Sequence, residues 1–387
     1  MPNFYFDYRD IFRAPRLALS GKKLFIQTSG FVLGYLGYLF LTYTAYLFSE
    51  ISISETWDSY GLFPLYDFVF NNWISWAIWG AGVVFMLVSW LLTNTCVAKV
   101  TYEQLKGDEF YSAKEAVRFL KKNWKTVLLS PLSILLMFIF LLACGLLIGL
   151  LGKIPVLGEI GFALFFGLPI FVVALFAVYI VFVLFNSLIL APAIVGTLPE
   201  DSFETIVQSF STTWNQPWRF FLYTGILGVL AKVGSFIFGY FCFRAIQLTI
   251  WVCGIFMSDK LYNLIEGGLA YLPYNPSVTN YMTNLFAGIS FGFQIPAPSE
   301  GVALNWSGEI AAFILGITFV LIGFVIFSYA LAIISAGQAI SFVIIYKKKE
   351  GENLLQRKTD EEDAEFVTET KKGKKLKLQS ELAGGSE

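Results

Sequence analysis

Lys232 is the residue whose type and position point most directly to chemistry, because it is a cation near the middle of the apolar stretch 220–257. A charge at the centre of a bilayer costs at least about 2.5–3.5 kcal/mol on insertion scales, so such a side chain normally faces protein or water. Its candidate partners are carbonyl groups, a lipid phosphate, and the amides of Asn186, Gln247 and Gln338. We treat these four side chains as a candidate intramembrane polar site, with a purely structural role as the alternative.

Arg244 is a second cation in the same stretch, twelve residues after Lys232. On a helix it lies about 18 Å further along the axis and about 120° around it, so the two cations do not share a face. Arg244 falls at the expected end of the span, where snorkelling to the interface explains it without a function. The predicted spans contain no acidic residue that could pair with Lys232, which argues against a proton relay.

Catalytic and metal chemistry have little support in the residue types. The chain contains no histidine, which removes the commonest general base and metal ligand. Its four cysteines lie in or beside apolar segments without a CxxC pair, which is typical of small residues in a membrane core. They are Cys96, Cys144, Cys242 and Cys253. We find no acid–base pair or nucleophile constellation, and we expect no enzyme activity, no metal, no cofactor and no nucleic-acid partner.

The elements that must position these residues are transmembrane helices. The chain is 56% hydrophobic and 14% charged, whereas soluble domains are about 25% charged. About 20 apolar residues of helix cross a bilayer, and only helices or closed barrels satisfy the backbone there. The apolar stretches predict an all-α polytopic transmembrane helix bundle of about six spans, 24–346. The spans are 24–48, 73–97, 126–151, 162–190, 220–243 and 310–346.

The charges that flank the spans predict their orientation. Basic residues concentrate in the N-terminal arm, 1–23, in the loop 98–125 and in Lys347–Lys349, which fall on one side when there are six spans. The positive-inside rule then places both termini in the cytoplasm, and we expect a multi-pass protein of the bacterial cytoplasmic membrane. The loop 191–219 departs from the pattern because most of its charged residues are acidic. Acidic residues weigh little in this rule.

Three segments lie outside the spans. Aromatic and aliphatic residues recur at helical spacing in the arm before Pro15, which predicts a short helix in the membrane interface. The region 258–308 is expected to be an external loop region. The tail, 350–387, has blocked charge and few apolar residues, so we expect it to be disordered and to contact a membrane or cytoplasmic protein partner, with a solvated tail as the alternative. Candidate contacts to anionic lipid in the bilayer are Lys347, Lys348, Lys349, Lys371, Lys372, Lys374 and Lys375.

Two patterns concern how the helices pack. Each of the two expected cytoplasmic loops has a serine that predicts an N-cap, Ser112 and Ser202, followed by an amphipathic helix that a Trp closes. The constant offset of 90 residues suggests a duplicated unit, and independent amphipathic helices are the alternative. The pairs Gly30/Gly34 and Gly145/Gly149 have the small-xxx-small spacing that lets helices approach closely.

Short motifs give the chain a resemblance to a known group. They are Asp10-Ile11-Phe12-Arg13-Ala14-Pro15-Arg16, Ala191-Pro192-Ala193, Ser202-Phe203-Glu204, Ser209, and Tyr346-Lys347-Lys348-Lys349-Glu350-Gly351. Together they resemble a diffuse group of bacterial integral membrane proteins that is similar to the membrane domain of some glycerophosphodiester phosphodiesterases. The resemblance implies an architecture only, because no phosphodiesterase catalytic domain is present.

Three functional classes remain, and the third, an enzyme that acts on lipids, has no acid–base pair or nucleophile constellation to support it. A non-enzymatic membrane protein, acting as a scaffold, an assembly factor or a subunit of a membrane complex, is favoured by the scarce intramembrane charge and the charged tail. The alternative is a transporter or channel for a small or anionic solute with Lys232 in the pathway. The surroundings of Lys232 distinguish the scaffold from the transporter, because a transport role requires a polar cavity around its ammonium group.

Overall fold

The structure, a computed structural model, describes residues 4–49, 51–64, 70–165, 169–198, 201–270 and 304–356. These residues form helices and no strand. Six of the helices are long and apolar enough to cross a membrane, which confirms the prediction of an all-α polytopic fold. They are α2 (Gly21–Phe48), α4 (Trp73–Lys106), α5 (Ala113–Gly152), α7 (Phe171–Thr197), α9 (Pro217–Met257) and α12 (Trp306–Glu350).

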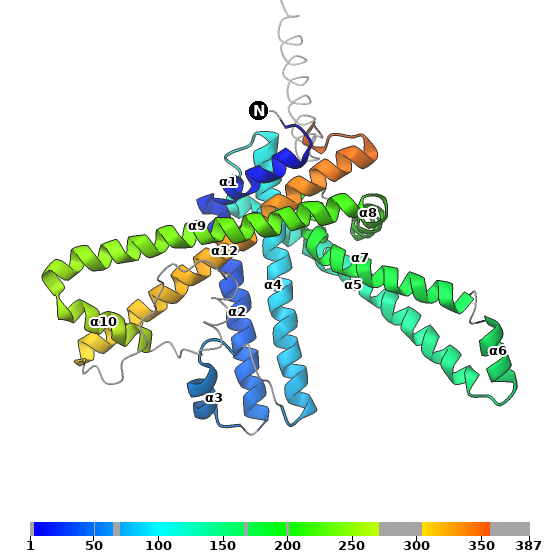
Figure 1. Ribbon diagram of the computed structural model, residues 1–387, viewed down its shortest axis with the longest axis horizontal. Coiled ribbons are helices and arrows are strands. Elements are labelled where there is room, and N and C mark those ends of the chain that lie inside the picture. The colour runs from blue at the N-terminus through cyan, green and yellow to red at the C-terminus, as the bar shows by residue number, and fades with distance from the viewer. Residues whose placement is uncertain are drawn as a thin grey trace, which may run out of the picture.

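The six helices form three hairpins, in which α2 packs on α4, α5 on α7, and α9 on α12. A shorter helix lies at the far turn of each hairpin: α3 (Ile53–Tyr60), α6 (Leu157–Phe165) and α10 (Asp259–Ala270). Figure 1 shows that the hairpins meet at one end and diverge toward the other. We call the meeting end the hub and the diverging parts the arms. The hub also contains η1 (Tyr8–Arg13), α1 (Ala14–Ala18), α8 (Ser202–Asn215) and η3 (Leu354–Gln356).

The basic flanks of the spans all belong to helix ends that meet in the hub. Lys22 and Lys23 begin α2, Lys106 ends α4, and Lys347–Lys349 lie in the last turns of α12. This is the arrangement that the predicted orientation requires, because one end of the molecule then carries most of the positive charge. Which side of the membrane the hub occupies stays a prediction.

Several helices extend beyond their predicted spans. The last two stretches remain single helices, since α9 has 41 residues and α12 has 45. At 1.5 Å per residue each is longer than about 60 Å, twice the thickness of a bilayer core. The predicted fourth span, 162–190, is covered by the end of α6 up to Phe165 and by α7 from Phe171. Pro169 and Ile170 form a π-helical turn that leads directly into α7.

The N-terminal arm contains a short helix before Pro15, as predicted, in the form of the 3₁₀-helix η1. Pro15 occupies the first turn of α1, which follows directly, because its missing N–H is not needed there. The position of the arm in a membrane interface stays a prediction. The arm packs into the hub with Asp10 and Ile11 fully buried. The Asp10 carboxylate accepts a hydrogen bond from the Phe6 N–H at 2.8 Å, and the Tyr329 hydroxyl of α12 donates to the Pro15 carbonyl at 3.0 Å.

The two inner elbows are alike in sequence and different in structure. Ser112 caps α5 as predicted, in a reciprocal capping box with Glu115. Asp201 rather than Ser202 is the N-cap of α8. The amphipathic start of α5 runs without a break into its apolar part, whereas α8 and α9 are separate helices joined at Gln216. Duplication of the elbow stays a prediction.

The two glycine pairs, Gly30/Gly34 and Gly145/Gly149, have the same spacing but lie in different surroundings. A Cβ atom at Gly34 would lie 2.9 Å from the Cβ of Ser89, so this pair of glycines allows α2 to approach α4 closely. Gly30 has the same role against Thr93. Nothing lies within 4 Å of a Cβ atom at Gly145 or Gly149, so this face of α5 is open.

The segment after α3 returns along the side of α2. The hydroxyls of Tyr43, Tyr35 and Tyr38 donate to the carbonyls of Gly61, Leu62 and Pro64, at 2.5, 2.5 and 3.0 Å. Tyr43 and Tyr35 lie 5 and 13 residues before the end of α2 at Phe48, about 8 and 20 Å along its axis. The segment 61–64 therefore lies beside α2, a helix that is apolar enough to cross a membrane. Non-helical backbone is stable within a membrane only when its polar groups have partners.

Replacing Tyr35, Tyr38 and Tyr43 together by Phe removes the three donors and should release the segment 61–64. Three lost hydrogen bonds of about 1 kcal/mol each should raise the open population roughly a hundredfold. The measurement is the rate at which a membrane-impermeant maleimide labels Leu62→Cys in a chain whose native cysteines are replaced by Ala. Tyr262→Phe, which alters an exposed tyrosine of α10, is the control. Equal labelling of all three chains would show that the tyrosines do not hold this segment.

Candidate functional site

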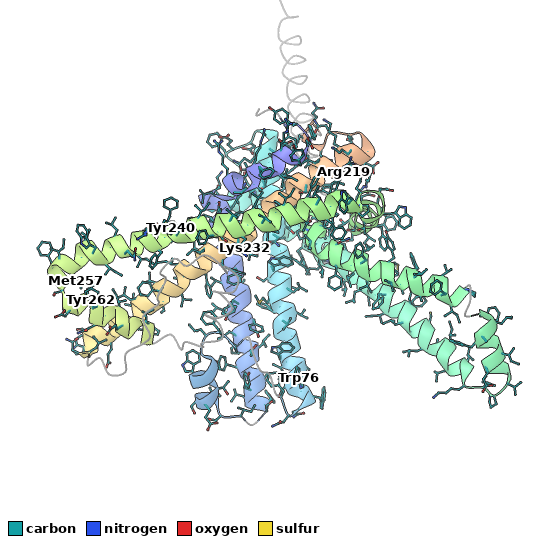
Figure 2. The ribbon with its side chains drawn as sticks, in the orientation of Figure 1. Trp76, Arg219, Lys232, Tyr240, Met257 and Tyr262 are labelled. Carbon is teal, nitrogen blue, oxygen red and sulfur yellow. The ribbon has the colours of Figure 1, made fainter. Side chains whose placement is uncertain are left out.

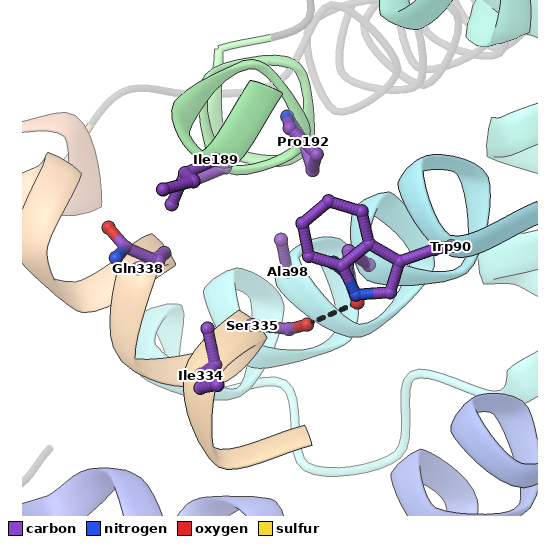
Figure 3. A pocket seen from close by; sticks show the side chains of 9 residues that line it. Trp90, Ala98, Ile189, Pro192, Ile334, Ser335 and Gln338 are labelled. Carbon is purple, nitrogen blue, oxygen red and sulfur yellow. Dashed lines mark hydrogen bonds between the residues drawn. The ribbon is translucent and has the colours of Figure 1, made fainter. Parts of the chain in front are cut away.

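The three hairpins meet around a small cavity in the hub, which Figure 3 shows from close by. Its volume is about 10 Å³, about the space that one water molecule needs. One helix from each hairpin contributes to its wall. The lining residues are Trp90, Asn94 and Ala98 of α4, Ile189, Pro192 and Ala193 of α7, and Ile334, Ser335 and Gln338 of α12.

Hydrogen bonds between buried and half-buried side chains connect the helices around this cavity. The amide oxygen of Asn94 accepts from Gln27 of α2 at 3.2 Å and from Ser335 of α12 at 2.6 Å. The amide nitrogen of Gln338 donates to the hydroxyl of Thr224 in α9 at 3.0 Å. The amide oxygens of Gln27 and Gln338 are buried and accept no hydrogen bond from the described residues. These residues form the polar junction: Gln27, Asn94, Thr224, Ser335 and Gln338.

The second hairpin reaches the junction through close backbone contact. A Cβ atom at Gly196 of α7 would lie 2.8 Å from the Cβ of Ala98 and 3.0 Å from the backbone nitrogen of Lys99. Glycine at this position therefore permits α7 to touch the backbone of α4. Pro192 lies inside α7 and lines the cavity together with Ala193, so two residues of the motif Ala191-Pro192-Ala193 contribute to its wall.

Two lysines near the junction are buried, which the sequence pattern did not predict. Lys23 is fully buried and donates to the Leu17 carbonyl at 2.9 Å and to the Gln104 side chain at 2.8 Å. Lys99 forms a buried ion pair with Glu103, one helical turn further along α4. The only available signal was the i,i+4 spacing of Lys99 and Glu103, since positions beside a span also suit solvated charges.

The structure places the four residues of the predicted intramembrane site in separate surroundings. Lys232 is exposed on α9, partway between the hub and the far end of that helix (Figure 2). Asn186 is buried and donates to the hydroxyl of Thr213 in α8 at 3.2 Å. Gln247 is exposed and accepts from Arg244 at 2.9 Å. Of the four, Gln338 alone belongs to the polar junction.

The C-terminal lysines of α12 have different surroundings. The Lys347 ammonium group lies 3.3 Å from the centre of the Phe6 ring, and Lys349 donates to Gln208 of α8. Lys348 is exposed. Contact of these lysines with anionic lipid stays a prediction. Lys348 is the best placed of the three for it, because its side chain is the most exposed. Lys371, Lys372, Lys374 and Lys375 lie outside the described residues.

Comparison with known proteins finds no family model that matches the chain, and neither a curated protein nor a solved structure matches it significantly. Within the described part of the chain, no three His, Cys, Asp or Glu side chains gather as metal ligands would. All four cysteines are free thiols. The resemblance to the phosphodiesterase membrane domain stays a prediction. The chemistry of the junction is thus hydrogen bonding between helices.

Asn94→Leu should destabilise the hub, because Gln27 and Ser335 both donate to the lost amide. Hydrogen bonds between membrane helices average about 0.6 kcal/mol each, so we expect the free energy of unfolding to fall by about 1–2 kcal/mol. Titration of the detergent-solubilised protein with a denaturing detergent measures this change. Thr249→Val is the matched control, since the Thr249 hydroxyl is exposed and donates only within its own helix. Stability of Asn94→Leu equal to that of the unaltered chain would mean that apolar packing alone holds the hub.

Proposed function

We propose that the chain is a non-enzymatic integral membrane protein that acts as a scaffold, an assembly factor or a subunit of a membrane complex. Its hub faces the cytoplasm, because most of the basic residues lie there, and its arms spread in a bacterial cytoplasmic membrane. The tail beyond the described residues contacts a further partner at the same side. The uncovered sides of the arms are the observation that carries this proposal.

Among the residues that the structure describes, the arms leave most of their apolar surface without protein neighbours. Only 6% of the most apolar 18-residue window of α5 is buried, and the corresponding shares are 11% in α12 and 28% in α2. Lipid chains can cover such surfaces, and so can the helices of other membrane proteins. Membrane helices associate through close packing at small residues, and the open glycines Gly145 and Gly149 offer such a face on α5.

The geometry gives less support to a transport route. The cavity where the hairpins meet has room for about one water molecule. Lys232 lies on the outer surface of α9 rather than in that cavity. The carbonyls of Gly61, Leu62 and Pro64, which could line a polar route at membrane depth, are bonded to tyrosine hydroxyls. A scaffold role is compatible with the small cavity, with the exposed position of Lys232 and with the bonded carbonyls.

A photoreactive amino acid in place of Leu146 tests the open face of α5, since that side chain is 73% exposed and lies beside the glycines. We expect irradiation of intact cells to yield adducts with discrete membrane proteins. Gly149→Leu should reduce these adducts severalfold by filling the face, whereas Gly161→Leu should not, because Gly161 lies in α6 and has equally open surroundings. Removing residues 350–387 should eliminate any cytoplasmic partner that co-purifies and leave the adducts intact. Adducts with lipid alone would contradict the scaffold.

Lys232→Leu separates the scaffold from the transporter. For a scaffold we expect unchanged or improved membrane insertion, because a lysine at mid-membrane costs about 2.5–3.5 kcal/mol on insertion scales. The measurement combines the yield of folded protein with efflux of phosphate and chloride from proteoliposomes. Lys260→Leu, in the exposed start of α10, is the control. Efflux through the unaltered chain that Lys232→Leu alone abolishes would establish the transporter instead.

A further inference from the structure

An apolar groove runs along α9 where the N-terminal arm crosses it. Its volume is about 640 Å³, and η1 contributes one wall through Phe12. The remaining lining residues recur on α9 at spacings of three and four, so they belong to one face of the helix. They are Trp218, Phe221, Leu222, Gly225, Ile226, Val229 and Leu230.

Three arginines lie within one helical turn of residues that line the hub end of this groove. Arg219 lies one turn before Leu222, on the edge of the same face of α9. Arg9 precedes Phe12 by three residues in a 3₁₀-helix, where side chains at that spacing align on one edge. Arg16 follows Phe12 by four residues and is exposed, as is Arg9.

The acidic residues of the arm offset this cluster only in part, since Asp7 lies close enough to Arg9 to attract its guanidinium group. Arg219 also donates a hydrogen bond to the Gln216 side chain. Asp10 pairs with Arg13 at 3.5 Å, and Asp7 accepts a hydrogen bond from the first N–H of η1. No ion pair to Arg9, Arg16 or Arg219 is formed among the residues that the structure describes. The groove therefore combines an apolar floor with positive charge at one end.

Two further features fit the groove to a lipid. Trp218 is 78% exposed at the charged end, and tryptophan prefers the level of lipid headgroups. Gly225 lies in the middle of the floor, and nothing comes within 4 Å of a Cβ atom built there. The absence of a side chain at Gly225 leaves the floor open to an extended hydrocarbon chain.

We propose that this groove binds one molecule of an anionic glycerophospholipid. The phosphate lies among Arg9, Arg16 and Arg219, and one acyl chain follows α9 over Gly225. The arginines attract the anionic phosphate and the apolar floor binds the acyl chain, so both parts of one lipid molecule find complementary surfaces. Such a lipid joins η1 to α9 and so stabilises the contact of the N-terminal arm with the third hairpin. This site is independent of the proposed scaffold function.

Native mass spectrometry of the full-length protein in detergent tests the site, with phosphatidylglycerol and phosphatidylcholine of identical acyl chains as probes. We expect phosphatidylglycerol to be retained about tenfold or more over phosphatidylcholine, because three basic groups act on one headgroup. Gly225→Phe fills the groove and should lower this retention about tenfold. Gly254→Phe is the matched control, because it lies at the far end of α9 in equally open surroundings.

A second pair of variants tests the charge without altering the groove. The double variant Arg16→Gln, Arg219→Gln should remove the preference for phosphatidylglycerol, whereas Arg244→Gln, on the outer part of α9, should keep it. Equal retention of the two lipids by the unaltered chain would overturn the proposal. It would also be overturned if Gly225→Phe, eluting as a folded monodisperse protein, retained as much lipid as Gly254→Phe, since the lipid would then bind only as part of the general lipid shell.

Discussion

The buried amide of Asn94 is the interaction on which the arrangement of the hairpins depends. It accepts hydrogen bonds from both α2 and α12 while belonging to α4, so one oxygen atom connects the first hairpin to the third. In lipid there is little hydrophobic driving force between helices, because the acyl chains are as apolar as the helix surfaces. Hydrogen bonds and close glycine contacts, such as that of Gly196 with Ala98, must therefore hold the hairpins together. The contacts that join different hairpins lie in the hub, and the arms diverge beyond them.

The two ends of the chain complete the hub. The Tyr329 hydroxyl binds the Pro15 carbonyl, and the Tyr102 hydroxyl binds the Leu354 carbonyl at 2.7 Å, across 314 and 252 residues of sequence. Lys347 lies over the Phe6 ring at the same end. The N-terminal arm is synthesised long before α12, which supplies its partners. The hub thus closes only when the last helix is in place, so its stability depends on the whole chain.

The sequence predicts the elements of this fold better than their contacts. Apolar length alone identifies the six spanning helices, and residue type identifies the capping box of Ser112 and Glu115. Sequence spacing does not distinguish Gly30/Gly34, which face α4, from Gly145/Gly149, which face no protein atom within 4 Å. The burial of Lys23 escapes prediction for a similar reason, since its acceptor Gln104 lies 81 residues away. In each case the surroundings depend on whether a residue remote in sequence packs at that position.

The length of α9 links the hub to the surface on the far side. A helix of 41 residues is about 62 Å long, so it cannot fit upright within a core of about 30 Å. The guanidinium group of Arg244 donates to the Tyr240 hydroxyl and to Gln247 on the same helix, and its place at the end of the apolar core stays a prediction. Beyond Arg244 the helix leads to α10, whose Gly268 approaches the backbone of α12 closely enough that a Cβ atom would lie 2.9 Å from the Ala312 carbonyl oxygen. The third hairpin is therefore fastened at both ends, whereas α5 and α7 are joined to the rest of the described chain only near the hub. A molecule built in this way holds one arm in a defined position and leaves the sides of another open to neighbours in the membrane.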